Sequence, residues 1–294
     1  MARKTPQALK LIINGCAGRM GRTLLRLAQS DNEYQLIGGL EQTGAPCIGQ
    51  DLGSLIGAPD LSLPITDKPA DLLAQAHAII DFTTPESSVA LANMAAQITQ
   101  TTQQDAAVTQ VAPVAQGAQN IIHVIGTTGF TPNQEAEIKK AADHITIIKS
   151  SNMSLGVNLL ANLVQQAATT LQADWDIEIM EMHHKHKIDA PSGTALLLGE
   201  AAAKGRGQGL ADSAIYTRAG KKGAREKGKI GFASLRGGSV AGEHQVILAG
   251  ENERLVLGHI AENRDIFARG ALVAALWGRT QKCGLFSMHD VLGL

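Results

Sequence analysis

The chain has 294 residues, and its 26 lysines and arginines nearly balance its 27 aspartates and glutamates, for a formal net charge of −1 at pH 7. This balance argues against a protein that binds nucleic acid or membrane surfaces in general. A hydrophobic fraction of 44% excludes disorder along the whole chain, and the length lies between one large domain and two modest ones.

The cysteines and the start of the chain bear on location. Cys16, Cys47 and Cys283 are odd in number and far apart, which is typical of neither a disulfide framework nor a cysteine zinc site. The first apolar run ends at Asn14, too early for a secretory signal or a membrane span. We therefore expect a soluble, cytoplasmic protein with no nucleic-acid or membrane partner.

The first part of the chain alternates short apolar runs with helical patterns. A strand over residues 9–14 meets the glycine cluster 15–21, and a helical pattern follows. Further strands are predicted at 35–40, 78–80, 121–125 and 145–148, with a helix at 86–96. Thr131, Pro132 and Gln134 mark the start of another helix, as cap, first helical residue and capping-box partner. This alternation predicts an α/β fold with a doubly wound, Rossmann-type parallel sheet.

The second part predicts an α+β domain built on a mixed, largely open sheet. After a helical stretch at 154–171, strand-like segments follow at 176–182, 230–235, 243–249 and 254–260. Turn residues at 250–252 favour a hairpin, and a last helix at 266–277 returns to the first domain. We therefore expect a dinucleotide-binding domain over 1–152, completed by 265–294, and a domain for substrate binding and oligomerisation over 153–264.

Residues 97–120 fit neither part. They are rich in Gln, Thr and Ala, carry Asp105 as their single charged side chain and show no clean period. We interpret them as a surface insertion, with a helical extension as one possible form and no predicted chemistry.

The glycine cluster predicts a dinucleotide site. A helix that begins after Gly15, Gly18 and Gly21 offers free backbone N–H groups to a pyrophosphate. Glu41 ends the second strand at the distance where a carboxylate accepts hydrogen bonds from the adenosine ribose and repels a 2′-phosphate, although Arg19 could offer a phosphate partner. The spacing GxxGxxG varies the usual pattern, so a glycine-rich turn without a ligand stays open at this point.

A basic cluster at the end of a predicted strand holds His183, His184, Lys185, His186 and Lys187. Three imidazoles could bind a metal, but the two lysines place positive charge where a dication would lie, so we predict no metal site. A solvated basic turn is a second reading. The third is an anion pocket with proton-transfer groups, because histidine titrates near neutral pH and lysine adds a charged donor.

The segment after this cluster predicts a second anion receiver. Pro191, Ser192, Gly193 and Thr194 open an Ala- and Leu-rich helix, whose first N–H groups suit a carboxylate. Two anion receivers so close together predict a small polyanionic substrate.

These motifs make the chain recognisable, because end to end it resembles the 4-hydroxy-tetrahydrodipicolinate reductase family, also called dihydrodipicolinate reductase, of bacterial lysine and diaminopimelate synthesis. The most specific motif covers residues 181–195, and the supporting segments are 15–21, 81–83, 126–130, 151–152 and 242–244. The resemblance implies reduction of 4-hydroxy-tetrahydrodipicolinate to tetrahydrodipicolinate and water, with a hydride from NADH or NADPH. It also implies a homotetramer assembled through the second-domain sheet and a small dicarboxylate substrate.

The resemblance assigns roles position by position. It implies that two residues are catalytic, His183 as proton donor or acceptor and Lys187 as the proton donor at the reduced ring. It implies that the substrate is bound by His184, Ser192, Gly193 and Thr194. The cofactor site that it implies consists of Gly15, Cys16, Ala17, Gly18, Arg19, Met20, Glu41, Gln42, Gly126, Thr127, Thr128, Ser150, Ser151, Asn152 and Met153.

One departure from the family pattern concerns the cofactor. Many members follow the acid with an arginine that meets the 2′-phosphate of NADPH, whereas this chain has Gln42, so we predict a preference for NADH. Two other functions stay open from the residues alone: a different two-domain nicotinamide enzyme, such as an amino-acid dehydrogenase, and a regulatory module that senses the dinucleotide without turnover. The density of proton-transfer groups favours catalysis.

Overall fold

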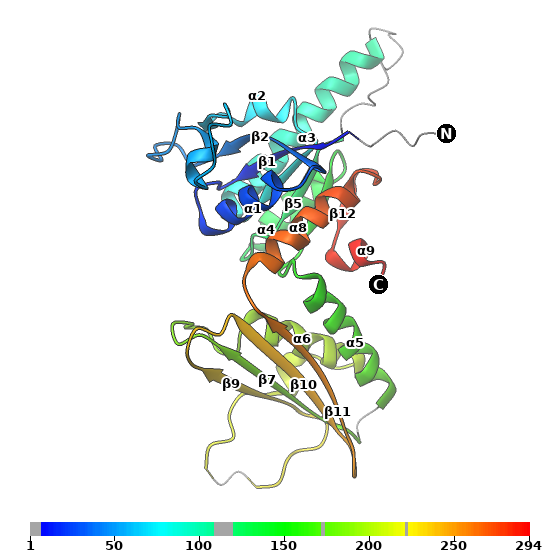
Figure 1. Ribbon diagram of the computed structural model, residues 1–294. Coiled ribbons are helices and arrows are strands. Elements are labelled where there is room, and N and C mark those ends of the chain that lie inside the picture. The colour runs from blue at the N-terminus through cyan, green and yellow to red at the C-terminus, as the bar shows by residue number, and fades with distance from the viewer. Residues whose placement is uncertain (1–6, 109–119, 172–173, 221–222) are drawn as a thin grey trace, which may run out of the picture. The chain divides into compact units, whose positions relative to one another are not determined.

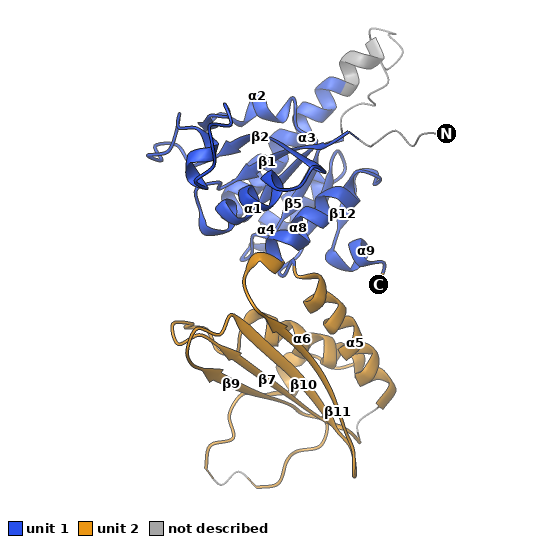
Figure 2. Ribbon diagram, viewed as in Figure 1, with its two compact units in different colours: residues 1–153, 267–293 blue, residues 154–266, 294 orange. Residues whose placement is uncertain are grey.

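The computed structural model describes residues 7–108, 120–171, 174–220 and 223–294 (Figure 1). The chain divides into two compact units, one made of residues 1–153 and 267–293 and the other of 154–266 with 294 (Figure 2). The first unit holds a seven-stranded parallel sheet and the second a five-stranded mixed sheet, so the predicted fold class is confirmed.

The parallel sheet has the strand order β12-β6-β5-β4-β1-β2-β3, and every neighbouring pair is parallel. Its strands are β1 (Leu9–Asn14), β2 (Tyr34–Leu40), β3 (Ile65–Thr66), β4 (Ala78–Asp81), β5 (Ile122–Ile125), β6 (Thr146–Lys149) and β12 (Gly284–Phe286). The order reverses between β1 and β4, and in open α/β sheets the crevice at such a reversal, outside the carboxyl ends of the strands, is where ligands bind.

Helices cover both faces of this sheet, which explains why β1 is apolar on both sides. The helices are α1 (Arg19–Gln29), α2 (Pro69–Leu73), α3 (Pro85–Val108), α4 (Pro132–Ala141), α8 (Asp265–Gly278) and α9 (Met288–Leu292), with a 3₁₀ turn η1 (Leu52–Leu55). Buried side chains of α2, α3 and α4 form one core with Ile12, Ile79 and Ile147. On the other face, α8 packs so closely that a Cβ at Gly278 would meet Ile122 and Ile148.

The mixed sheet of the second unit has the order β11-β10-β7-β9-β8. Its elements are α5 (Leu155–Leu171), β7 (Asp176–His183), α6 (Gly193–Gly205), α7 (Leu210–Ser213), β8 (Ala214–Ile215), β9 (Ile230–Arg236), β10 (Gly242–Ala249) and β11 (Arg254–Ala261). Strands β10 and β11 form the predicted antiparallel hairpin. Along β7 the exposure alternates, so that Ile177, Ile179, Glu181 and His183 share the buried face with the helices α5 and α6.

The segment 97–120 begins as part of the fold. Helix α3 continues through Val108, and Thr99 within it is 2% exposed, while residues 109–119 lie outside the described residues. The elements η1, β3, α2, α7, β8, β12 and α9 were not predicted, because two to five residues are too few for a period to be visible. Among the described residues, no helix is long and apolar enough to cross a membrane.

The close packing of Gly21 generates a stability prediction. A Cβ at this position would collide with the Gly15 carbonyl oxygen and lie 2.7 Å from Cys16 Cα. We expect Gly21→Ala to lower the free energy of unfolding by about 2 kcal/mol, since the backbone of the turn has to shift. Urea unfolding followed by circular dichroism measures it. The matched control is Gly258→Ala, whose new methyl group would meet its nearest atom at 3.5 Å; equal midpoints for both variants would contradict the prediction.

Candidate active site

The carboxyl edge of the parallel sheet brings the predicted cofactor residues together. Chain segments that leave β1, β2, β5 and β6 begin at this edge, because all these strands run in the same direction. The residues found there are Gly15, Glu41, Gly126 and Ser150, each directly after the last residue of its strand.

The glycine turn after β1 is shaped for an anion. Gly15 has a φ of +72°, and the place of its missing side chain is taken by Thr83, whose Cγ2 lies 2.6 Å from an ideal Cβ. Gly18 is the N-cap of α1 and brings no side chain to cap the first N–H groups of that helix. These features fit a bound pyrophosphate, which would receive hydrogen bonds from those N–H groups.

Glu41 is anchored on this turn. Its Oε1 accepts a hydrogen bond from the Ala17 N–H at 2.8 Å, and its Oε2 accepts one from the Gln42 N–H at 3.3 Å. A cavity of about 190 Å³ adjoins the carboxylate and is lined by Asn14, Leu40, Glu41, Gln42, Thr43, Asp67, Pro69, Ser87, Ala90, Leu91 and Met94. Asp67 was missed by the sequence analysis, because it follows a strand of two residues that no pattern indicates.

The other predicted cofactor residues differ in exposure. Arg19, Thr128 and Ser151 are exposed, whereas the side chains of Cys16 and Met153 are buried. Burial raises the pKa of the Cys16 thiol to about 12. Cys16 therefore contributes only its backbone to the surface of the turn.

A buried carboxylate organises the site in the second unit. Glu181 is 1% exposed and accepts two hydrogen bonds from the Arg236 guanidinium, at 2.8 and 2.9 Å. It also accepts from the Ser192 N–H at 3.2 Å and lies 2.5 Å from Nδ1 of His183. Burial by itself would raise the pKa of Glu181, but the hydrogen bonds from Arg236 and His183 outweigh it and hold that pKa below its ordinary value.

This carboxylate orients the predicted catalytic histidine. Because Glu181 engages Nδ1 of His183, Nε2 is the ring nitrogen that can meet other partners. Among the described residues, Nε2 makes no hydrogen bond. The His183 ring meets the His244 ring edge-on, with centroids 5.1 Å apart. Burial and the neighbouring His183 lower the pKa of His244 to about 4, so His244 is neutral at pH 7.

The start of α6 is tied to the same cluster. Ser192 is the N-cap, and its hydroxyl accepts from the Ala195 N–H at 3.1 Å and shares a 3.0 Å hydrogen bond with Nε2 of His244. The backbone of Gly193, which is exposed, and that of Thr194 form the first turn of the helix. Their N–H groups lie at the positive end of the helix dipole, where a carboxylate is favoured.

Lys187 and His184 lie in the turn between β7 and α6. The Lys187 ammonium pairs with the Asp189 carboxylate at 2.8 Å, and Arg236 donates to the Asp189 carbonyl oxygen at 2.6 Å. The turn is closed by the Lys187 N–H, which donates to the His184 carbonyl oxygen at 3.1 Å. Glu181 thus contacts His183, Ser192 and Arg236 directly, and Lys187 is connected to them through Asp189. His184 lies in the same turn, where its N–H donates to the Val240 carbonyl oxygen at 2.8 Å.

Glu181, Arg236 and His244 are functional candidates to which the sequence analysis gave no role. The alternation of β7 was the available signal for Glu181, because it puts this acid on the same buried face as Ile179. Arg236 carried no such signal, since only the pairing of β7 with β9 places it opposite His183. No group of three or more His, Cys, Asp or Glu side chains within the described ranges could hold a metal ion.

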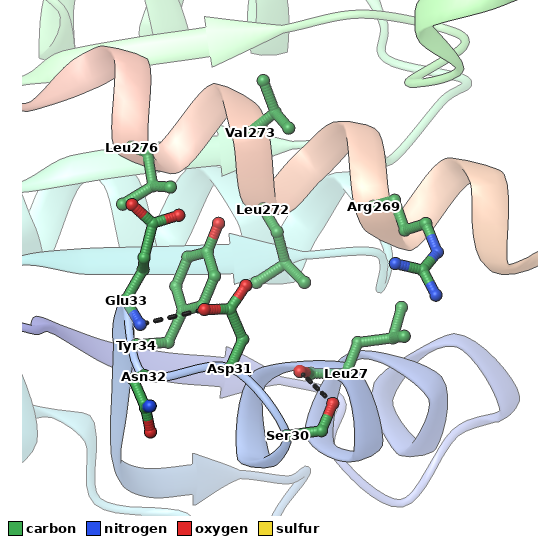
Figure 3. Close-up of a pocket in the computed structure, with 10 residues that line it drawn as sticks. All are labelled: Leu27, Ser30, Asp31, Asn32, Glu33, Tyr34, Arg269, Leu272, Val273 and Leu276. Carbon is green, nitrogen blue, oxygen red and sulfur yellow. Dashed lines mark hydrogen bonds between the residues drawn. The ribbon is translucent and has the colours of Figure 1, made fainter.

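A larger cavity, of about 480 Å³, lies beside the amino end of β2, away from the carboxyl ends of the strands (Figure 3). It is enclosed by the end of α1, the loop into β2 and α8, with Tyr34 and Arg269 among its side chains. None of the predicted site residues lines it.

The parallel sheet with its switch point, the glycine turn and the acid after β2 define the class of pyridine nucleotide-dependent reductases with a Rossmann fold. The chain belongs to the dihydrodipicolinate reductase family. It matches the family's N-terminal description, "Dihydrodipicolinate reductase, N-terminus", over residues 9–102 and 98–153, and "Dihydrodipicolinate reductase, C-terminus" over residues 156–292.

Individual relatives agree over nearly the whole length. The chain is 52% identical over 287 residues to a 4-hydroxy-tetrahydrodipicolinate reductase of Rhizobium meliloti (strain 1021), covering 97% of this chain and 98% of the relative. It is 54% identical, with the same coverage, to one of Parvibaculum lavamentivorans (strain DS-1 / DSM 13023 / NCIMB 13966). Among solved structures, a dipicolinate-bound dihydrodipicolinate reductase from Paenisporosarcina sp. TG-14 has the same fold, with a TM-score of 0.72, 24% identity and coverage of 96% of this chain and 98% of that chain.

The lowered pKa of His244 predicts a pH dependence of stability. The pKa of His244 is near 6.5 in the unfolded chain and near 4 in the folded one. As the pH falls below 6.5, the unfolded chain therefore takes up a proton that the folded chain does not, and the free energy of unfolding decreases until about pH 4. The loss attributable to this residue is about 3 kcal/mol. We expect His244→Gln to flatten the fall in urea-unfolding free energy between pH 6.5 and 4. An equal slope of unfolding free energy against pH in the wild type and in His244→Gln would contradict the lowered pKa of His244. Glu181 is present in both proteins, so its protonation cancels in the comparison.

Proposed function

We propose that the protein is a 4-hydroxy-tetrahydrodipicolinate reductase. The observation that carries the proposal is the cluster of His183, Arg236 and Ser192 around the buried Glu181 carboxylate, next to Lys187. A cluster of cationic and proton-transfer groups beside a helix N-terminus suits a small dicarboxylate, and the structural relative from Paenisporosarcina is described as bound to dipicolinate, a dicarboxylate. Two relatives with that name, 52% and 54% identical to this chain over 287 residues, support the same activity.

We propose that the cofactor is held by the first unit. The pyrophosphate would lie on the turn from Gly15 to Met20, the adenosine ribose against Glu41 and Gln42, and the nicotinamide half among Gly126–Thr128 and Ser150–Met153. The reduced nicotinamide supplies the hydride. Because Glu41 and Asp67 both line the cavity beside the turn and Gln42 brings no positive charge, a 2′-phosphate would meet carboxylates there, which supports a preference for NADH.

We propose that the second unit binds the substrate and manages its protons. His184, Ser192, Gly193 and Thr194 would hold the carboxylates, with the N–H groups of the first α6 turn as donors. The net reaction replaces the ring hydroxyl by hydrogen and takes up one hydride and one proton. Loss of water would remove the hydroxyl together with a proton from a neighbouring ring carbon, the hydride would add to the carbon that bore the hydroxyl, and one proton would return to the neighbouring carbon. The Lys187 ammonium is the donor at the ring, and His183, whose Nδ1 is fixed by Glu181, presents Nε2 for the other proton transfer.

The proposed setting follows from this activity. The reaction would belong to lysine and diaminopimelate synthesis. A cytoplasmic location is consistent with free thiols at Cys16, Cys47 and Cys283.

The decisive assay follows loss of reduced-nicotinamide absorbance after addition of freshly made condensation product of pyruvate and aspartate semialdehyde. We expect rapid oxidation by the wild type, a higher kcat/KM with NADH than with NADPH, and a loss of kcat of at least about 100-fold in Lys187→Ala with the cofactor Kd unchanged, because a general acid contributes to the chemical step. Binding of either cofactor without oxidation would favour a different substrate or a sensor. Equal losses in kcat and cofactor affinity would indicate a structural role for Lys187, and a strong NADPH preference would contradict the cofactor assignment.

We also propose a homotetramer that uses the sheet of the second unit. Helices α5 and α6 pack on one face of this sheet, and the opposite face carries exposed apolar side chains on its outer strands. Leu235 is 46% exposed, Val256 52% and Ile260 68%. Apolar groups so exposed on one sheet face are typical of a surface covered by another subunit.

Sedimentation equilibrium tests this assembly. We expect the wild type to have the mass of four chains, and Val256→Asp to form smaller species, because a carboxylate would be buried in the interface. Val273→Asp is the matched control, since Val273 is 40% exposed on α8, outside this face, and we expect it to leave the mass unchanged. A monomeric wild type, or a Val256→Asp protein of unchanged mass, would contradict the proposal.

A further inference from the structure

A histidine interrupts an apolar row of the parallel sheet. His123 on β5 lies opposite Ile79 on β4 and Ile147 on β6, and all three side chains are 0% exposed. Burying an imidazole in such surroundings costs stability unless its polar atoms are hydrogen-bonded. A leucine or isoleucine would fill the same row without that cost, so we expect an interaction that requires the imidazole.

The partner of His123 is Asp81, the last residue of β4. Nε2 of His123 lies 3.3 Å from Oδ2 of Asp81, which is also 0% exposed. Nδ1 of His123 has no partner among the described residues, so the tautomer with its hydrogen on Nε2 meets the carboxylate and leaves no donor unsatisfied. Burial by itself would raise the pKa of Asp81, but hydrogen bonds from His123, Thr83 and Ser88 outweigh it and hold that pKa below its ordinary value.

The Asp81 carboxylate in turn fixes two loops. Its Oδ1 accepts from the Thr83 N–H at 2.9 Å and from the Thr83 hydroxyl at 2.6 Å, both in the loop after β4. The same oxygen lies 3.4 Å from the hydroxyl of Thr127, in the loop after β5. Thr127 is held a second time, because its hydroxyl oxygen accepts from the Thr83 N–H at 3.0 Å and from the Ser88 hydroxyl at 3.0 Å.

Thr83 extends this network to the glycine turn. Its methyl group fills the place of a Cβ at Gly15, so the position of Thr83 limits the position of the turn. Asn14, directly before Gly15, reaches the Thr83 hydroxyl at 3.4 Å and the Ser87 hydroxyl at 3.1 Å. Asn14 and Asp81 are also register partners on β1 and β4, the two strands at the switch point.

We propose that His123 and Asp81 form a buried positioning pair that sets the affinity for the reduced nicotinamide cofactor. The pair holds Thr83 and Thr127, and through them the loops after β1, β4 and β5, in the conformation that receives the dinucleotide. His123 touches neither cofactor nor substrate and acts only through Asp81. The inference rests on the proposed function in one respect, since it takes these loops to bind the cofactor.

The test is a direct titration of NADH fluorescence, without substrate, against wild type and variants. We expect His123→Leu to raise the Kd for NADH by about tenfold, because the loops lose their anchor at Asp81. His123→Gln keeps an amide donor near the place of Nε2, and we expect it to remain within about twofold of the wild type. Steady-state kinetics should then show a higher KM for NADH in His123→Leu at an unchanged KM for substrate.

His77→Leu is the matched control. His77 lies in the same unit at the opposite edge of the sheet, just before β4, and its Nδ1 accepts from the Lys10 N–H at 3.1 Å. We expect this variant to lower the melting temperature and leave the Kd for NADH unchanged. A His123→Leu protein with a Kd within twofold of the wild type, or a His77→Leu protein with an equal rise in Kd, would overturn the proposal.

Thr83→Val keeps the test decisive if His123→Leu does not fold. Valine retains the methyl contact with Gly15 and removes the hydroxyl that donates to Asp81. We expect a severalfold rise in the Kd for NADH, and an unchanged Kd would overturn the proposal. A wild type that binds NADH but does not oxidise it with the substrate would contradict the proposed function and leave this inference standing, whereas a wild type that binds neither cofactor would overturn the inference.

Discussion

The second unit depends on one buried negative charge. A carboxylate that is 1% exposed is tolerated only where hydrogen-bond donors and positive charge compensate it, and Glu181 obtains both from Arg236, His183 and the Ser192 N–H. Because these partners come from β9, β7 and the start of α6, satisfying one charge fixes three segments at once. The catalytic geometry that we propose is a consequence of that compensation.

The first unit uses the same principle at a different place. Asp81 is buried at the end of β4, and its donors come from β5 and from the loops after β4 and β5. In both units a buried acid lies at or near the end of a strand, where it can hold loops that the regular sheet does not reach. Loops ordered in this way are prepared for a ligand before it arrives, which lowers the free-energy cost of binding.

Local patterns predicted the strands of four or more residues and the helices of ten or more. Burial on both faces makes β1 and β4–β6 largely apolar, and alternation marks β7 and β10. The glycine turn and the histidine cluster were also predictable, because each is a continuous stretch of sequence. Glu41 was predictable because it directly follows a predicted strand. The contacts of Arg236 with Glu181 and of His123 with Asp81 were not, because they depend on which strands become neighbours and in what register. His123 in particular reads from the sequence as an ordinary structural residue.

We propose that this chain transfers a hydride from a reduced nicotinamide to a cyclic dicarboxylate, at the ring carbon from which the hydroxyl group is lost. The most direct measurement is mass spectrometry of the product formed with NADH that carries deuterium at both positions of nicotinamide C4. We expect a tetrahydrodipicolinate with a single deuterium on the ring carbon that bore the hydroxyl group. Product without deuterium, or oxidised cofactor without this product, would contradict it.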